Sequence, residues 1–240
     1  MGTIVIQARM GSQRLPGKVL RTMNGRPMLA MMLESIKRCR WGQSIIVATS
    51  TSRKDDPIRN YCLRERIKVY SGPEENVAGR FQELLLNLDG TAFVRLCADS
   101  PLIDYRLIDQ AIVKFEEGNW DIVTNVFPRT FPHGQSVELV RSDIYLDQYP
   151  KFFKQTHYEH VTTYFYQFAD QFSIFNLDSK QLHRELSLAV DTIDDFSRIE
   201  DIVKKMVKPT WSYSVDDIIA LSHSNSCLSK NDGIEQKNHE

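Results

Sequence analysis

The chain has 240 residues, and its 30 lysines and arginines nearly balance 31 aspartates and glutamates, so the formal net charge is −1. That balance argues against a generally basic nucleic-acid surface or a polybasic membrane surface. The hydrophobic fraction of 42% favours a packed core and excludes a disordered chain. The charge is nevertheless uneven, because five cations precede the first acidic residue, Glu34: Arg9, Arg14, Lys18, Arg21 and Arg26. This unopposed basic opening predicts a local site for an anion.

The first half of the chain alternates short apolar runs with segments of helical spacing. We expect strands over residues 3–8, 44–50, 68–70, 91–97 and 121–124. We expect helices over residues 26–40, 57–66, 76–87 and 105–117. Such alternation indicates βαβ units, and therefore a mostly parallel sheet with helices on both faces.

The second half is less regular. Strands are expected over residues 135–140, 172–175 and 186–190, and helices over residues 158–168, 194–207 and 215–221. We expect one domain over residues 1–221 and a disordered tail over 222–240, where hydrophobic periodicity is lost. Ligands of open parallel sheets bind at the carboxyl ends of strands. The loops after residues 3–8, 44–50, 91–97 and 186–190 are therefore the places to look for a site.

Compartment and membrane association follow from the cysteines and the apolar runs. The four cysteines are widely spaced and form no C-x-x-C pair, which is typical of reduced thiols: Cys39, Cys62, Cys97 and Cys227. No signal-peptide pattern and no apolar run of about 20 residues is present. We expect a cytoplasmic protein without membrane or nucleic-acid partners.

The loop after the first strand, residues 7–18, contains two glycines, a proline, two arginines and a lysine. Glycines let the backbone approach a ligand, and the cationic side chains can bind phosphate. The loop is not a Walker A motif, because five residues separate Gly11 from Gly17 and Val19 replaces the metal-binding hydroxyl. The dinucleotide G-x-G-x-x-G pattern is absent as well. A solvated surface turn with incidental charges is the alternative.

Any Mg²⁺ should therefore be held outside this loop. Asp99 and Asp191 each follow an apolar run and would lie at the same rim of the sheet. Two carboxylates can attach Mg²⁺ to a triphosphate. The structural alternatives are that Asp191 or Thr192 caps the next helix and that Asp99 begins the turn before Pro101.

Five segments in this order match a known family: QARMGSQRLPGKVL, RLCADSPLID, RTFPHGQSVELV, EHVTTYFY and LAVDTIDDF. Together they resemble the cytidylyltransferase family typified by spore coat polysaccharide biosynthesis protein F, which is related to the CMP-Kdo and CMP-sialate synthetases. The resemblance covers about residues 3–205. It implies a three-layer α/β/α Rossmann-like nucleotidyltransferase fold, the nucleotide-diphospho-sugar transferase fold, with a small β-containing lobe and often a homodimer.

The resemblance also implies a reaction and residue roles. A nucleotidyl group passes from CTP or a related NTP to a sugar or sugar phosphate, for surface polysaccharide synthesis, and pyrophosphate is released. Ala8 and Arg9 would lie near the base and ribose. The triphosphate would be held by Gly11, Ser12, Arg14 and Lys18, of which Arg14 and Lys18 act in catalysis with Asp99. The metal ligands would be Asp99 and Asp191. The sugar would be faced by His133, Gly134, Gln135, Glu138, Glu159 and His160.

The sequence departs from the commoner family pattern near the sugar. That pattern has an acidic residue where His133 stands, and Leu-Asp where Gln135 and Ser136 stand. The acceptor sugar therefore stays open. The choice between CTP and another NTP also stays open, because base selection often rests on backbone contacts.

Two other functions compete with this interpretation. A glycosyltransferase that uses a nucleotide sugar would commonly hold its metal with a D-x-D pair, which the chain lacks. A non-catalytic nucleotide or sugar-phosphate binder is the second alternative, which only an activity measurement excludes.

Overall fold

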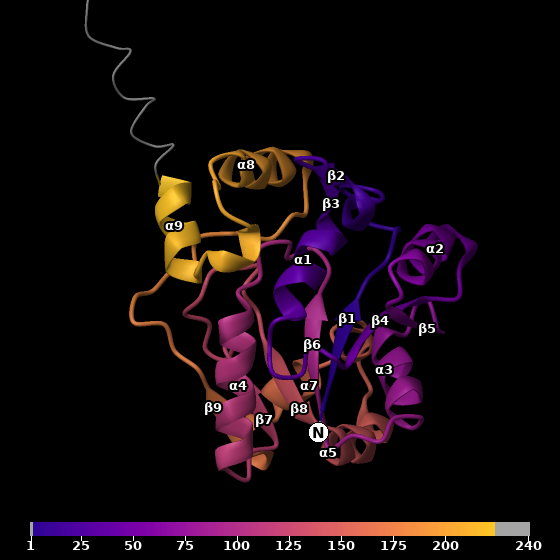
Figure 1. Ribbon diagram of the computed structural model, residues 1–240. Helices are drawn as coiled ribbons and strands as arrows, with labels where there is room; N and C mark the ends of the chain where they lie inside the picture. Colours follow the sequence, from indigo (N-terminus) through magenta and orange to yellow (C-terminus); the bar gives the residue numbers. More distant parts are fainter. Residues whose placement is uncertain (1, 224–240) are drawn as a thin grey trace, which may run out of the picture.

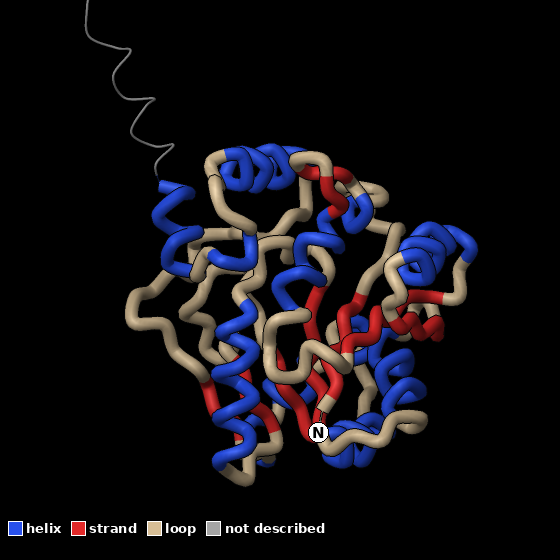
Figure 2. The backbone as a smooth tube through the Cα atoms, viewed as in Figure 1, coloured by secondary structure: helices blue, strands red, loops and turns tan. Residues whose placement is uncertain are grey.

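The computed structural model describes residues 2–223, and within them a seven-stranded sheet forms the centre of the molecule. Its strand order is β5 (Lys68–Gly72), β4 (Ile45–Ser50), β1 (Thr3–Gln7), β6 (Ala92–Cys97), β8 (Glu138–Arg141), β7 (Ile122–Thr124) and β9 (Ile174–Asn176). The strand β8 runs antiparallel to both of its neighbours, while the other strand pairs are parallel. Figure 2 shows the strands running through the middle of the molecule with helices around them. The predicted mostly parallel sheet is confirmed.

Helices cover both faces of this sheet (Figure 1). One core lies beneath α1 (Met28–Ile36), α2 (Asp56–Arg64) and α4 (Tyr105–Glu117). The second core lies beneath α3 (Val77–Leu85), α5 (Ser142–Gln148), α6 (Gln155–Glu159) and α7 (Thr163–Gln167). Along β1 the side chains alternate between the two cores, because successive residues of a strand point to opposite faces: Ile4 and Ile6 enter the first, and Val5 the second. The predicted three-layer α/β/α architecture is confirmed.

A small lobe adjoins the carboxyl ends of the central strands (Figure 1). It contains the hairpin β2 (Thr22–Met23) and β3 (Arg26–Pro27) with the helices α8 (Ile193–Lys204) and α9 (Val215–His223). Its own apolar cluster joins Met23, Leu188 and Phe196. Short 3₁₀ turns occur at Lys18–Leu20, Arg53–Asp55, Tyr149–Lys151, Ala169–Gln171 and Thr210–Ser212.

Two predicted helices differ from the observed ones. The helix expected over residues 26–40 begins only at Met28, because residues 22–27 form the β2–β3 hairpin around Asn24 and Gly25, both with positive φ. The helix expected over residues 158–168 is two short helices, α6 and α7, separated where Val161 has a φ of 23°. The apolar pattern of the sequence continues across this break, because Tyr164 and Phe165 of α7 are buried. That continuity explains why a single helix was predicted.

Two predicted strands also differ. Residues 186–190 form no strand and make only one bridge, from Ser187 to His133. Leu188 and Val190 are buried in the lobe instead, which explains the strand-like pattern. The strand expected over residues 135–140 begins at Glu138. The helix α5, which follows it directly, was not predicted.

Among the described residues, no helix is long and apolar enough to cross a membrane. The cysteines Cys39, Cys62 and Cys97 are free thiols, and Cys227 lies outside the described residues. Of the tail predicted over 222–240, Ser222 and His223 belong to α9, and the remainder lies outside the described residues.

Candidate active site

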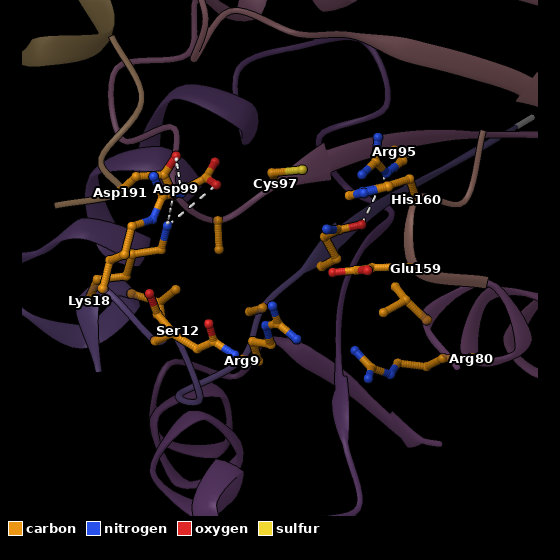
Figure 3. A pocket seen from close by; sticks show the side chains of 17 residues that line it. Arg9, Ser12, Lys18, Arg80, Arg95, Cys97, Asp99, Glu159, His160 and Asp191 are labelled. Atoms are coloured by element: carbon orange, nitrogen blue, oxygen red, sulfur yellow. Dashed lines mark hydrogen bonds and ion pairs between the residues drawn. The ribbon is translucent and has the colours of Figure 1, made fainter. Parts of the chain in front are cut away.

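A cavity of about 480 Å³ opens at the carboxyl ends of β1 and β6 (Figure 3). Its walls come from the loop after β1, the first turns of α3, the end of β6, the α6–α7 junction and the segment before α8. The predicted site residues that line it are Ala8, Arg9, Ser12, Arg14, Lys18, Asp99, Glu159, His160 and Asp191. Nine predicted residues from four separate segments of the chain therefore meet around one cavity.

The loop after β1 is fixed in place by Asp55, a buried acid at the end of the second 3₁₀ turn. Asp55 accepts a hydrogen bond from the backbone amide of Met10 at 2.7 Å, and further bonds from the amide and hydroxyl of Ser50. Burial alone would raise the pKa of Asp55, but these hydrogen bonds outweigh burial and lower it. Gly17, with φ of 71°, turns the loop back so that its amide donates to the carbonyl of Met10. The loop is therefore ordered before any ligand arrives.

Gly11 is an exception among the predicted phosphate-loop residues. It is exposed, it does not line the cavity, and a Cβ placed on it would meet nothing within 4 Å. Neither the loop's conformation nor its packing requires a glycine at this position.

A lysine spans two carboxylates at the rim of the cavity. Lys18 Nζ lies 2.8 Å from Asp191 Oδ1 and 3.6 Å from Asp99 Oδ2, and it donates to the carbonyl of Val190 at 2.7 Å. The Lys18 side chain is 10% exposed, whereas those of Asp99 and Asp191 are 28% and 42% exposed. Arg14 lies outside this group, with its Nη2 3.2 Å from Asp191 Oδ2. One nearly buried ammonium thus holds together two acids that remain open to the cavity.

The capping role considered for Asp191 belongs to its neighbour. Thr192 Oγ1 accepts from the amide of Asp195, and the Asp195 carboxylate accepts from the amide of Thr192, which is a capping box for α8. The Asp191 side chain is thereby left to face Lys18. The amide of Val190 also donates to the carbonyl of Asp99 at 2.9 Å, which ties the two aspartate segments together.

Asp99 and Asp191 are the two carboxylates at this rim that could bind a metal ion. Across residues 2–223, no group of three or more His, Cys, Asp and Glu side chains is arranged to hold a metal ion. A divalent cation at Asp99 and Asp191 would need further oxygen ligands from a substrate or from water. Such a shared arrangement is typical of Mg²⁺ bound to phosphates.

Arg80 forms part of the opposite wall and was missed in the sequence. It extends from α3, is only 2% exposed, and donates through Nε and Nη2 to the carbonyl of Pro73, at 3.2 and 2.7 Å. Burial is the largest effect and lowers the pKa of Arg80; Asp55 opposes this, and the nearby Arg9 adds a smaller lowering. In Figure 3 its guanidinium lies across the cavity from Lys18. The sequence carries no local signal for Arg80, because its place at the cavity depends on how α3 packs against the sheet.

Arg95, Gln7 and Cys97 also line the cavity without having been predicted. Arg95 Nε donates to Gln7 Oε1 at 3.0 Å across the β1–β6 pairing. Burial raises the pKa of the Cys97 thiol to about 12, so this cysteine is protonated at neutral pH and is no thiolate nucleophile.

The predicted sugar-facing residues divide into two groups. Glu159 and His160 are exposed side chains at the α6–α7 junction and line the cavity. His133, Gly134, Gln135 and Glu138 do not line it. His133 is an exposed residue. Partial burial of its imidazole and the nearby Arg129 lower the pKa of His133, and Asp191 opposes this.

The other three residues of the second group are buried. Gly134 has a φ of 88°, and a Cβ there would lie 2.4 Å from the backbone of Leu188, so only glycine fits. Gln135 bonds the amide of Asp104 and the carbonyl of Leu102. Glu138 is 3% exposed and bonds Arg95, Thr162 and Tyr166. These groups hold the cavity's framework together.

Known proteins share both the sequence pattern and the fold. The family described as Cytidylyltransferase matches residues 3–211. The spore coat polysaccharide biosynthesis protein SpsF of Bacillus subtilis is 27% identical over 230 residues, which cover 92% of this chain and 93% of that protein.

Two solved structures extend the comparison. A cytidylyltransferase from Leptospira borgpetersenii serovar Hardjo-bovis superposes with a TM-score of 0.89 at 25% identity, covering 98% of this chain and 99% of that one. A CMP:2-keto-3-deoxy-manno-octonic acid synthetase complexed with CTP shares the fold, with a TM-score of 0.66 at 16% identity over 85% of this chain and 98% of that one. The predicted relation to SpsF and to the CMP-Kdo synthetases is confirmed, and the chain belongs to the cytidylyltransferase family.

Proposed function

We propose that this protein transfers CMP from CTP to a sugar or sugar phosphate and releases pyrophosphate, with Mg²⁺ as its metal ion. The arrangement of Lys18 between Asp99 and Asp191, at the rim of the cavity, carries this proposal. A cation and two open carboxylates at one rim match a substrate that combines phosphate charge with a divalent metal. The family supports the nucleotide, because CTP is the ligand in the related synthetase complex.

The site fits Mg²⁺ by the chemistry of its donors. Asp99 and Asp191 supply hard carboxylate oxygens, and Mg²⁺ is usually bound by one or two carboxylates plus substrate phosphates. When bound, the ion would neutralise phosphate charge and orient the triphosphate. Lys18 would then keep both carboxylates in place, and Arg14 with Ser12 would contact the phosphates from the loop.

Arg80 supports the choice of cytosine as the base. A guanidinium is a donor-only group, and Nε and Nη2 of Arg80 are already directed at backbone carbonyls. The remaining Nη1 would bond an acceptor on the nucleotide. Cytosine presents two adjacent acceptors, O2 and N3, whereas uracil carries a donor at N3. A buried arginine that lines the same cavity as Ala8 and Arg9 would therefore favour cytosine over uracil.

The acceptor would approach the wall formed by Glu159 and His160. An acceptor oxygen would attack the α-phosphorus in line with the departing pyrophosphate. The protein's contribution would be alignment and charge neutralisation by Lys18 and Arg14, without a covalent intermediate. The B. subtilis relative supports a product used in surface polysaccharide synthesis.

A nucleotide panel tests this function. The protein is incubated with each of the four NTPs, with and without Mg²⁺, and with sugar phosphates or acidic sugars, and pyrophosphate release is measured. We expect release with CTP, acceptor and Mg²⁺ together. Asp99→Asn should lower the rate by about 10²–10³, whereas Asp194→Asn, at a nearby exposed acid that does not line the cavity, should leave it unchanged.

Two further measurements separate the alternatives. Release of UDP from a UDP-sugar without any NTP would establish the glycosyltransferase instead. Nucleotide binding without turnover of any acceptor would establish the non-catalytic binder. The homodimer and the cytoplasmic location stay predictions, the first testable by light scattering.

A further inference from the structure

We propose that Glu138 is a positioning residue: its buried carboxylate holds the α6–α7 junction so that Glu159 and His160 face the cavity. Glu138 lies in β8 directly opposite Arg95 of β6, and the two side chains form an ion pair and a hydrogen bond. Arg95 in turn bonds Gln7 of β1. One oxygen of Glu138 is thereby fixed to the central strands of the sheet.

The other oxygen of Glu138 is directed to the second helical layer. Glu138 Oε1 accepts from the hydroxyl of Thr162 at 2.6 Å and from the hydroxyl of Tyr166 at 2.8 Å. Thr162 immediately precedes α7, and Tyr166 lies one turn into it. A single carboxylate therefore joins the sheet to the start of α7.

The junction needs such a restraint because its backbone turns sharply. Val161 has a φ of 23°, which is unusual for a β-branched residue, and the amide of Thr163 donates to the carbonyl of His160 at 2.8 Å. Glu159 and His160 are exposed and line the cavity, whereas Val161 and Thr162 are buried. The hydroxyl of Thr162, which is bonded to Glu138, therefore restrains the backbone two residues after His160, whose side chain lines the cavity.

The same contacts argue against Glu138 as a ligand of the sugar. Its side chain is 5% exposed, both of its oxygens are bonded within the protein, and it does not line the cavity. Burial alone would raise its pKa, but Arg95 and the two hydroxyls outweigh burial, and the carboxylate stays ionised. It acts on the reaction through Thr162 and the residues before it.

The kinetic test rests on the proposed function. Glu138→Gln, Thr162→Val and Tyr166→Phe are compared with His160→Ala, and kcat and KM are measured separately for nucleotide and acceptor. The matched control is Thr163→Val, because the Thr163 side chain makes no hydrogen bond to Glu138. We expect the first three variants to change the same parameter as His160→Ala, with a loss of about 10–100-fold in kcat/KM for Glu138→Gln, since small misplacements in a site are costly. Thr163→Val should behave as the wild type.

A second measurement does not depend on any reaction. Amide hydrogen exchange is followed in residues 155–167 of each folded variant. Positioning predicts faster exchange there in Glu138→Gln, Thr162→Val and Tyr166→Phe, and no change in the control. This result would stand even if the wild type turned over no sugar, so failure of the proposed function is recognised separately.

Two outcomes would overturn the proposal. In one, Glu138→Gln lowers activity while Thr162→Val and Tyr166→Phe match the wild type in both kinetics and exchange, which would make Glu138 a direct ligand. In the other, exchange in residues 155–167 is unchanged in all three variants. Thr162→Val and Tyr166→Phe retain the Arg95–Glu138 pair, so they keep the test decisive if Glu138→Gln does not fold.

Discussion

Two groups of charged residues at this cavity have opposite characters. The rim group, defined as Lys18, Asp99 and Asp191, has one nearly buried cation and two acids that are 28% and 42% exposed. The inner group, defined as Arg95 and Glu138, has side chains that are 13% and 5% exposed and bonded to protein atoms. The carboxylates of the rim group are open to the cavity and could bind a metal ion or a substrate, whereas the polar atoms of the inner group are bonded to the protein itself.

This contrast teaches that charge at a cavity does not by itself indicate a ligand. A buried carboxylate whose oxygens are all bonded has no oxygen left to offer, even when it lies a few residues from the substrate. The substitutions below should therefore separate stability from activity. Inner-group changes should lower stability as well as activity, whereas rim-group changes should lower activity with little loss of stability.

The largest effect on stability should come from Glu138→Ala. It would leave the buried Arg95 guanidinium without its carboxylate, which costs about 3–5 kcal/mol when one partner of a buried pair is removed. Denaturant unfolding measures the change. Asp99→Asn is the comparison and should lower the free energy of unfolding by about 1 kcal/mol or less, because its pair with Lys18 is long and partly exposed. Equal losses in both variants would remove the distinction between the two groups.

Activity should depend most on Lys18. We expect Lys18→Ala to lower the rate of pyrophosphate release by about 10²–10³, by analogy with the loss of one preorganised charge-stabilising donor. Lys54→Ala, at an exposed lysine that does not line the cavity, is the control. A normal rate in Lys18→Ala would contradict the assignment of the triphosphate to this rim.

Base selection should depend on Arg80. We expect Arg80→Gln to lower kcat/KM for CTP by about 10–100-fold, the value of a hydrogen bond from a charged donor, and to lower the preference for CTP over UTP. The measurement is a competition between the two nucleotides. An unchanged preference would show that Arg80 is a framework residue like Arg95.

Lowering the pH should reduce the stabilisation that the inner group gives to the fold. The pKa of Glu138 is lowered in the folded protein, so its contribution to stability is fully present above the ordinary value of 4.5 and is lost as the pH falls through the lower folded value. Unfolding followed below about pH 4.5 should show a steeper loss of stability in the wild type than in Glu138→Gln, by up to about 1.4 kcal/mol per pH unit for one proton. Parallel curves would contradict the ionised buried pair.

The smallest expected change is that of Arg14→Ala on stability. Its ion pair with Asp191 is exposed at both ends, 66% and 42%, so removing it should change the free energy of unfolding by about 1 kcal/mol or less. Thermal unfolding measures this. A larger loss would mean that Arg14 also supports the fold of the loop.

Much of the fold could be predicted from local patterns, because β1, β4 and β6 are buried runs and α4 has a clear helical period. The break at Val161 could not, since helical periodicity continues across it and the residue that follows it bonds Glu138, 24 residues earlier in the chain. The apolar residues 186–190 pack into the lobe without forming a strand, and periodicity does not distinguish the two.

The site residues also divide into those that could be predicted from the sequence and those that could not. The meeting of Lys18 and Asp99 follows from placing loops at the carboxyl ends of strands, whereas Asp191 reaches the same rim although the residues before it form no strand. Arg80 lies inside a helix, and Arg95 lies inside a strand with a partner 43 residues away, so neither carries a local signal of its position. Their roles require the register between β6 and β8 and the packing of α3.

The most direct test of the central claim is the Mg²⁺ dependence of pyrophosphate release from CTP in the wild type and in Asp99→Asn. The account predicts that wild-type release requires both Mg²⁺ and an acceptor, and that Asp99→Asn loses about 10²–10³ in rate while its unfolding transition stays close to that of the wild type. Release by Asp99→Asn at the wild-type rate and with the same Mg²⁺ dependence would contradict it.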